Sequence, residues 1–395
     1  MRKFRDRNHE SDNKPDGGKS VSRREFLGAL GVTSAGALLG ACSRAKSPVA
    51  PATDAAKAGS VAGIVRHPLR IDGGPVKVAT ANVSTYDHDA LRRNLESMFD
   101  ALGGISDVVG GKTVGMKVNL TANQSDPIYG YKISPCELYW THPEVVRVVG
   151  ELARDAGAGQ LTIIEAPYDP KFYKDYGFEE VADSLGATLV NLNKVEPYAS
   201  FVDRAVGANW LIYEKFTQNA ILNDIECVIS FPKPKEHDGA GFTNAMKNLV
   251  GTLPLGGYGG KDTWRSGIHQ HREYDNNTNS NLRRVVLDLN GATRIHFAVA
   301  DAIKTALGAE GPWGRNFKPA SFNKLIAGKD VVAVDSVSCQ VIGFDPMAAD
   351  DTGVFKDGIN YLRLAQEKGM GTYDLSQIEV VDATVSTGIR ERKPL

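Results

Sequence analysis

The chain has 395 residues, of which 42% are hydrophobic and 24% charged, with 41 Gly and 18 Pro. This composition is that of a globular protein and excludes collagen-like, coiled-coil and wholly disordered chains. Lys and Arg number 46 against 47 Asp and Glu, so the formal net charge of -1 gives no basic excess for nucleic acid. The four cysteines are too few and too scattered for a disulfide scaffold or a C-x-x-C metal site.

The first 41 residues have the pattern of an export signal. A polar segment ends at Arg23 and Arg24, and an apolar run of about 14 residues follows as far as Leu39. A signal peptide needs roughly 7–15 apolar residues, whereas a bilayer-spanning helix needs about 20. An arginine pair before such a run is typical of twin-arginine signals, so we expect the twin-arginine (Tat) translocase as a partner during export. The alternative is an N-terminal core helix.

A lipid anchor follows the signal in this interpretation. Leu39-Gly-Ala-Cys42 resembles a bacterial lipobox, in which Cys42 becomes the lipid-bearing first residue of the mature chain; the alternative is a plain signal with a chance cysteine. Residues 42–63 are small residues and prolines, typical of a flexible tether. We therefore expect a lipoprotein of the periplasm or cell envelope, with an α/β domain over 64–395 and two candidate lobes, about 64–225 and 226–395.

Strand and helix patterns alternate from Val76 onward. The expected strands are 76–83, 113–120, 161–165, 187–192, 227–231, 294–300, 324–327 and 379–381. The expected helices are 90–102, 143–156, 178–185, 244–249, 282–289, 330–342 and 358–368, with Thr141 as the N-cap of the second. This alternation predicts an α/β fold: a mostly parallel sheet in Rossmann-like layers, with helices on both faces and a cleft between the lobes.

Lysines dominate the expected carboxyl ends of the strands, where ligands bind in such sheets. Lys233 and Lys235 flank Pro234, which fixes the backbone, so both ammonium groups can face one anion; the alternative is a pair of solvated loop lysines. Lys117 and Lys247 would add cations to the same cleft, and each would lower the pKa of its neighbours. A lysine with a lowered pKa can act as a base or a Schiff-base nucleophile, although anion binding is the preferred interpretation.

Four histidines are candidates for acid–base or metal chemistry. His237 stands between two acidic residues and suits a general acid or base, or a metal ligand. His142 precedes Pro143, so it either orients a helix start or belongs to the site. His269 and His271 would project to the same side of an extended segment as metal ligands, and the alternative is a wet loop.

Two carboxylates complete the candidate metal set. Asp301 directly follows the strand expected at 294–300, and Asp335 lies in an apolar segment. Buried carboxylates usually bind a metal, cap a helix or pair with a lysine. Asp301, Asp335, His269 and His271 are therefore candidate metal ligands, and pairing with a lysine inside the fold is the alternative for Asp335.

Six motifs in order, over roughly 117–346, resemble those of the domain-of-unknown-function 362 family (DUF362). They are Lys117-Val-Asn-Leu120, Thr141-His-Pro-Glu144, Ile229-Ser-Phe-Pro-Lys-Pro-Lys-Glu-His237, Lys247-Asn-Leu-Val-Gly251, Asp301-Ala-Ile303 with Glu310-Gly-Pro-Trp-Gly314, and Asp330-Val-Val-Ala-Val-Asp335. The family has no agreed reaction, so the resemblance implies a fold and the location of a site, and leaves the activity unassigned.

The chain departs from part of that family. Some members carry ferredoxin-type cysteine repeats, whereas this chain has no C-x-x-C, which argues against an iron–sulfur cluster. Cys227 and Cys339 lie in apolar contexts that favour small buried hydrophobes. The segment from His237 to Lys247 distantly resembles lactate-racemase-like proteins, where a His and a Lys frame a nickel-pincer nucleotide. A metal or organic cofactor therefore stays open, and its identity is unknown.

The expected function is an enzyme acting on a small anionic substrate. Its catalytic residues would be His237 and Lys247. Its substrate-binding residues would be Lys117, Asn119, His142, Lys233, Lys235 and Asn248. The rival is a non-catalytic periplasmic protein that binds a ligand, metal or cofactor, or serves in maturation. Because both functions need the same cationic site, the sequence leaves open whether the protein is an enzyme.

Overall fold

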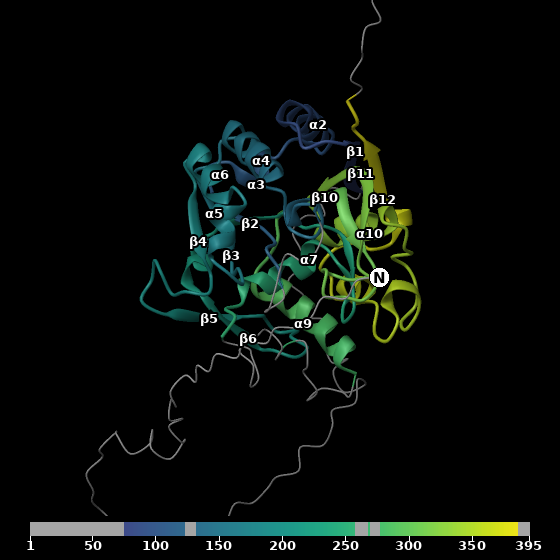
Figure 1. Cartoon of the computed structure of the whole chain (residues 1–395). Helices are drawn as coiled ribbons and strands as arrows, with labels where there is room; N and C mark the ends of the chain where they lie inside the picture. The colour runs from purple at the N-terminus through teal and green to yellow at the C-terminus, as the bar shows by residue number, and fades with distance from the viewer. Residues whose placement is uncertain (1–74, 123–131, 257–267, 269–276, 386–395) are drawn as a thin grey trace, which may run out of the picture. The chain divides into compact units, whose positions relative to one another are not determined.

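The computed structural model describes residues 75–122, 132–256, 268 and 277–385. They form an eight-stranded sheet in the order β12-β1-β11-β10-β7-β2-β3-β4 (Figure 1). Its strands are β1 Val76–Asn82, β2 Thr113–Lys117, β3 Gln160–Glu165, β4 Thr188–Asn191, β7 Cys227–Ser230, β10 Phe297–Leu307, β11 Lys318–Gly328 and β12 Ile378–Asp382. β11 runs antiparallel to its neighbours β1 and β10, and the other pairs are parallel.

Helices and two hairpins surround this sheet. The α-helices are α2 His88–Ala101, α3 Ser106–Val109, α4 Pro143–Asp155, α5 Lys171–Asp175, α6 Phe178–Leu185, α7 Ala245–Asn248, α9 Thr278–Ala292, α10 Val331–Val341 and α11 Tyr361–Glu367. The 3-10 helices are η2 Pro135–Glu137, η3 Ala220–Asn223, η4 Leu249–Thr252, η5 Gly353–Phe355 and η6 Leu375–Gln377. The hairpins pair β5 Phe201–Ala205 with β6 Lys215–Asn219, and β8 Lys235–His237 with β9 Gly241–Thr243.

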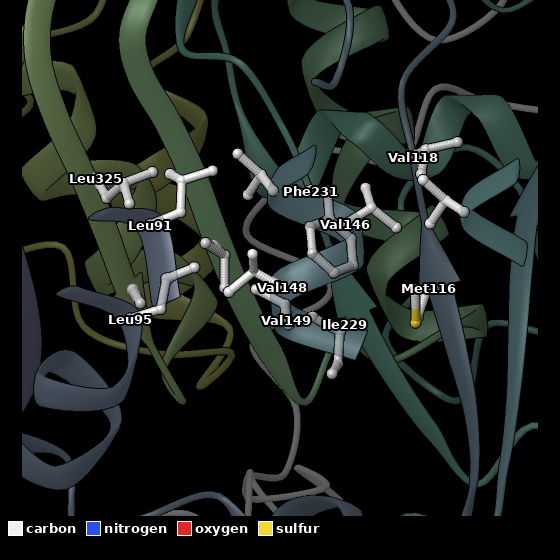
Figure 2. Packing of buried hydrophobic residues seen from close by; sticks show 14 of the residues in the cluster. Leu91, Leu95, Met116, Val118, Val146, Val148, Val149, Ile229, Phe231 and Leu325 are labelled. Atoms are coloured by element: carbon white, nitrogen blue, oxygen red, sulfur yellow. The ribbon is translucent and has the colours of Figure 1, made fainter. Parts of the chain in front are cut away.

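Both faces of the sheet are buried. Successive side chains of a strand point to opposite sides, so each strand contributes residues to two hydrophobic clusters. Met116 and Ile229 lie in the hydrophobic cluster that α2, α4 and α6 complete, as Figure 2 shows for the residues of α2 and α4. Val228 and Ala298 belong to the opposite cluster, which α7, α9, α10 and α11 complete. The expected α/β fold, with a mostly parallel sheet and helices on both faces, is thereby confirmed.

Several local expectations need correction. β10 continues to Leu307 instead of ending at residue 300, so Asp301 lies within a strand. His142 is the N-cap of α4, where we expected Thr141, because its Nδ1 accepts the Glu144 N–H at 3.2 Å. The hairpins β5–β6 and β8–β9 were not expected. The two candidate lobes share one sheet, since β7 pairs with both β2 and β10.

Some expectations fall outside the residues that the structure describes. These are the signal with Arg23 and Arg24, the linker with Cys42, and the pair His269 and His271. Across 75–122, 132–256 and 277–385, no helix has the length and apolarity needed to cross a membrane.

The order of the strands determines where a site can form. From β2 the chain passes through α4 to β3 and then β4, whereas from β7 it passes through α7 and α9 to β10 on the other side. The adjacent parallel strands β2 and β7 are therefore a topological switch point, outside whose carboxyl ends open α/β sheets bind ligands. Lys117 and Ser230 are the last residues of these two strands.

Asp335 connects this region to the helix layer. It lies on α10 and is fully buried, and its carboxylate oxygens accept the N–H groups of Ala245 at 2.8 Å and Met246 at 3.2 Å. Burial raises the pKa of Asp335 to about 7, although these two N–H donors oppose the shift. Asp335 thus anchors the start of α7, the short helix that carries Lys247 and Asn248.

We predict that Asp335→Ala lowers the free energy of unfolding by about 2–6 kcal/mol, because two buried N–H groups lose their acceptors at about 1–3 kcal/mol each. Urea unfolding followed by circular dichroism measures this loss. Asp335→Asn is the matched control: it keeps one oxygen acceptor and should lose about half as much. An alanine variant within about 0.5 kcal/mol of the wild type would contradict the anchoring role.

Candidate functional site

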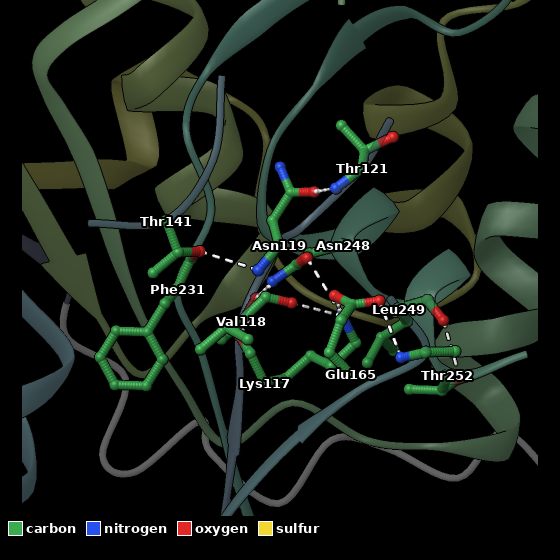
Figure 3. A network of polar contacts seen from close by, with 12 residues as sticks. Lys117, Val118, Asn119, Thr121, Thr141, Glu165, Phe231, Asn248, Leu249 and Thr252 are labelled. Carbon is green, nitrogen blue, oxygen red and sulfur yellow. Dashed lines mark hydrogen bonds and ion pairs between the residues drawn. The ribbon is translucent and has the colours of Figure 1, made fainter. Parts of the chain in front are cut away.

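Lys117 and Glu165 form a buried ion pair at the ends of adjacent strands. Lys117 Nζ lies 2.6 Å from Glu165 Oε2 and donates to the Val118 carbonyl at 2.6 Å (Figure 3). The two side chains are 0% and 3% exposed. A buried ammonium requires such a countercharge, since desolvating an unpaired ion costs several kcal/mol. Lys117 is therefore neutralised within the protein.

Asn248 and Gly251 join this pair to α7 and η4. Asn248 Oδ1 lies 3.4 Å from Lys117 Nζ, and its Nδ2 donates to the Lys117 carbonyl and to Ser230 Oγ, each at 3.0 Å. A Cβ on Gly251 would lie 2.2 Å from Glu165 Oε1 and 2.5 Å from Lys117 Nζ, so any larger residue clashes there. The Lys-Asn-Leu-Val-Gly motif thus fastens Lys247 beside the switch point.

Lys233 forms the second buried ion pair. Its Nζ lies 2.7 Å from Asp301 Oδ2 and also donates to the Lys304 carbonyl at 2.7 Å and to the Tyr86 hydroxyl at 3.0 Å. Burial lowers the pKa of Lys233, and the Asp301 carboxylate opposes that shift. All three donor positions of this ammonium group are occupied, so Lys233 is a fixed and internally compensated cation.

His142 stacks on Tyr86 at the side of this pair. The ring centroids are 3.6 Å apart and the planes differ by 3°. Burial, together with Lys233 and Lys304, lowers the pKa of His142 to about 3, so its imidazole is neutral. Because Nδ1 accepts the Glu144 N–H, we assign the single ring proton to Nε2. His142 both caps α4 and presents a hydrogen-bond donor.

Lys235 differs from Lys117 and Lys233 because no carboxylate pairs with it among the residues that the structure describes. It is 1% exposed, and its Nζ donates to the Tyr139 carbonyl at 2.9 Å, an oxygen that also accepts from Asn119 Nδ2 at 3.1 Å. Burial, Lys247 and Lys233 lower the pKa of Lys235 to about 7. A substantial fraction of this lysine is thus an uncharged amine at neutral pH.

His237, at the end of β8, is also held by its Nδ1 atom. Nδ1 accepts the N–H groups of Gly239 at 3.0 Å and Ala240 at 3.1 Å, so we assign the ring proton to Nε2. Glu310 Oε2 lies 3.9 Å from Nδ1. Burial alone would raise the pKa of Glu310, but the charge that the His237 ring carries when doubly protonated, the Trp313 indole N–H and Lys247 together lower it to about 2. The carboxylate is therefore ionised beside the His237 ring.

The structure brings most of the candidate binding and catalytic residues together at the switch point. Lys233 and Lys235 are each 1% exposed, so the alternative of solvated loop lysines is wrong. Lys247, 9% exposed, acts electrostatically on both Lys235 and Glu310. Asn119 serves indirectly, by holding the carbonyl that Lys235 contacts.

The candidate metal ligands have other partners where they are described. Asp301 pairs with Lys233, and Asp335 accepts backbone N–H groups instead of pairing with a lysine. Within 75–122, 132–256 and 277–385, no three His, Cys, Asp or Glu side chains gather so as to hold a metal ion. Because His269 and His271 lie outside those ranges, their metal role stays a prediction.

The described cysteines are free and buried, namely Cys136, Cys227 and Cys339. Burial raises the pKa of Cys136 and Cys227 to about 12 and also raises that of Cys339. Their thiols are therefore protonated at neutral pH, and Cys227 and Cys339 pack as small hydrophobes, as expected.

Three partners of the site lysines were missed by the sequence analysis. Glu165 ends an apolar strand, the same signal that singled out Asp301, and it could have been found that way. Glu310 lies inside a motif that was recognised but given no role. Tyr86 is a single tyrosine between a strand and a helix, and nothing in its neighbours marks it.

The chain is similar in sequence to one curated protein and in structure to two solved proteins. The chain is 25% identical over 274 residues to a thylakoid-associated protein of Synechocystis sp. (strain PCC 6803), with 68% of this chain and 75% of that protein covered. A Thermotoga maritima protein of known structure is 12% identical with a TM-score of 0.34, over 65% of this chain and 58% of that one. The lactate racemase apoprotein of Thermoanaerobacterium thermosaccharolyticum is 12% identical with a TM-score of 0.34, over 63% and 54%.

The family match covers the site residues from Lys117 to Asp335, and Tyr86 lies outside it. The model of the family described as "Domain of unknown function (DUF362)" matches residues 114–340, which is more than half of the 395 residues. It includes both ion pairs, the β8–β9 hairpin, α7 and Glu310. The chain therefore belongs to the DUF362 family.

Proposed function

We propose that this protein is an enzyme that binds a small anionic substrate at Lys235 and Lys247. The observation that carries the proposal is the contrast among three buried lysines. Lys117 and Lys233 are each paired with a carboxylate, whereas the Nζ of Lys235 contacts a neutral carbonyl. An anionic ligand would supply the countercharge that Lys235 lacks, and this favours binding because a buried charge is stable when paired.

The histidines favour an acceptor-rich ligand as well. His237 and His142 both use Nδ1 as an acceptor, which leaves the proton on Nε2. A neutral imidazole of this kind donates a hydrogen bond from Nε2 to a carboxylate or carbonyl oxygen. We therefore assign His237 the role of donor to the substrate and Lys247 that of its electrostatic partner.

The rival function is a periplasmic protein that binds a ligand, metal or cofactor without turnover. It would use the same lysines, since both functions need an anion site. The buried, partly uncharged amine of Lys235 favours the enzyme, because such groups cluster at catalytic sites.

The cellular location belongs to the proposal. The twin-arginine pair Arg23 and Arg24 and the lipobox cysteine Cys42 support export and anchoring of the chain to a membrane through a lipid. The thylakoid-associated relative supports an association with membranes.

We predict that small carboxylates or inorganic phosphate raise the melting temperature of the full chain. Ligand-linked stabilisation follows RT ln(1 + [L]/Kd), about 2.7 kcal/mol at a hundred times Kd. Lys235→Gln and Lys247→Gln should abolish the shift, since Lys247 supplies a positive charge and Lys235 takes up a proton when an anion binds beside it. Lys77→Gln, at a lysine whose side chain is 51% exposed, removes the same charge elsewhere and should leave the shift intact.

Two results decide this experiment. An equal shift in all three variants would place anion binding elsewhere and contradict the proposal. With a ligand in hand, His237→Ala separates the two functions: an enzyme loses turnover more than affinity, whereas a binding protein has no turnover to lose.

We predict that Lys235→Met stabilises the protein more at pH 6 than at pH 9. The pKa of Lys235 is about 7 when folded against 10.5 for an ordinary lysine, so the unfolded chain binds the proton more tightly. The resulting penalty is fully present below pH 7 and disappears as the pH rises toward 10.5. Urea unfolding at the two pH values should give gains that differ by roughly 2–3 kcal/mol. In the control variant Lys77→Met, the change in the free energy of unfolding should be the same at both pH values. The same pH independence in Lys235→Met would contradict a lowered pKa of Lys235.

We predict that replacing Arg23 and Arg24 with lysine retains the full chain in the cytoplasm, because lysine lacks the planar guanidinium of the twin-arginine signal. Cell fractionation measures the exported share. Cys42→Ala should instead export the protein but release it from the membrane. Unchanged export of the double variant, or unchanged membrane association of Cys42→Ala, would count against the corresponding half of the localisation.

A further inference from the structure

The nitrogen of Lys235 is held in place as a nucleophile would be. Pro234 precedes Lys235, which pairs with Thr243 in the short β8–β9 hairpin. The Thr305 hydroxyl donates to the Pro234 carbonyl at 2.8 Å and fixes the hairpin to β10. The Tyr139 carbonyl accepts a single hydrogen bond from Nζ. The amine therefore has a fixed position while part of its bonding capacity is still open.

The other lysines of the site lack this combination. Lys117 and Lys233 each lie within 2.7 Å of a carboxylate oxygen, which holds them in the charged and non-nucleophilic form. Lys235 has the same burial, 1% exposed, without such a partner in the described part of the chain. An unpaired buried amine favours its neutral form, whose lone pair can attack an electrophile.

Asn119 links Lys235 to a partly buried position of the site through a shared hydrogen-bond acceptor. Its side chain donates to the same Tyr139 carbonyl as Lys235, and Asn119 itself is only partly buried. The nitrogen therefore lies two hydrogen bonds away from a partly exposed residue.

We propose that Lys235 forms an imine with a carbonyl group of the anionic ligand, so that the substrate class is a small oxo acid or an anionic aldehyde. This inference rests on the proposed function of the anion site. An anionic electrophile suits this amine because Lys247 acts on Lys235 as a neighbouring positive charge. A carbonyl is the electrophile that a neutral amine converts to an imine without any further reactant.

The step is balanced in atoms and electrons. The lone pair of Lys235 Nζ attacks the carbonyl carbon, and a C–N bond forms as the C=O π bond breaks to give a carbinolamine. The former carbonyl oxygen then leaves as water with the two hydrogens of the amine, and a C=N bond remains. No oxidant or reductant takes part. His237 donates a hydrogen bond from Nε2 to the carbonyl oxygen and stabilises the negative charge that develops there, while both protons of the departing water come from the amine.

The protonation state of Lys235 makes the reaction selective at neutral pH. Burial together with Lys247 and Lys233 lowers the pKa of Lys235 to about 7, so this amine loses its proton far more readily at neutral pH than an ordinary lysine with a pKa near 10.5. A carbonyl reagent at this pH should therefore react at Lys235 before it reacts at surface lysines.

Reductive trapping tests the inference. The folded full chain is incubated at pH 7 with pyruvate and sodium cyanoborohydride, and intact mass spectrometry followed by peptide mapping locates the adduct. We expect one reduced adduct for each chain on the peptide that contains Lys235, at least about tenfold above any other lysine. Acetone, a neutral ketone, should give much less. Lys235→Gln should lose the adduct, and Lys77→Gln should keep it.

The outcomes separate this inference from the proposed function. A melting shift with pyruvate but no adduct, or an adduct on Lys247 or spread over surface lysines, overturns the imine and leaves the anion site standing. If pyruvate gives neither a melting shift nor an adduct, both the imine and the anion site are overturned. Because peptide mapping of the wild type locates the adduct without a variant, a poorly folded Lys235→Gln protein does not obscure the result.

Discussion

A buried ammonium group needs a countercharge, and this requirement organises the centre of the molecule. Desolvating an unpaired ion costs several kcal/mol, so each lysine at the switch point must be neutralised by a carboxylate or give up its proton. Glu165 serves Lys117 and Asp301 serves Lys233. Lys235, as deeply buried as these two lysines, gives up its proton more readily instead. Lys235 is thus the reactive lysine because carboxylates neutralise the charges of Lys117 and Lys233.

The same requirement explains residues that never contact a ligand. Gly251 must lack a Cβ because the Lys117–Glu165 pair fills the space beside it, and Asn248 bonds both to that pair and to β7. Asp335 then secures the helix that carries Asn248. Gly251, Asn248 and Asp335 therefore hold the charged side chains in one hydrogen-bonded network. Moving any one charge in this network would disturb the others.

Sequence patterns predicted the sheet but only part of the site. The strand at 161–165 is visible because apolar residues on a doubly buried strand form a continuous run. The β8 strand is invisible to such reasoning, because its inward residues are Lys235 and His237 and its pattern resembles a polar loop. The lysines themselves were found from their proline-flanked motif. Their partners Glu165 and Tyr86 come from distant segments, and only the order of the strands brings them together.

The balance of donors and acceptors favours an anion over a cation. The carboxylates of Glu165, Asp301 and Asp335 are all engaged by lysines or backbone N–H groups, so they offer little to a positively charged ligand. Lys235 has donor capacity beyond its one carbonyl partner, and His237 carries its proton on Nε2. A ligand rich in acceptor oxygens matches the donor capacity that Lys235 retains, and an anion bound there would raise the pKa of Lys235. The protonation state of this one amine would then report occupancy of the site.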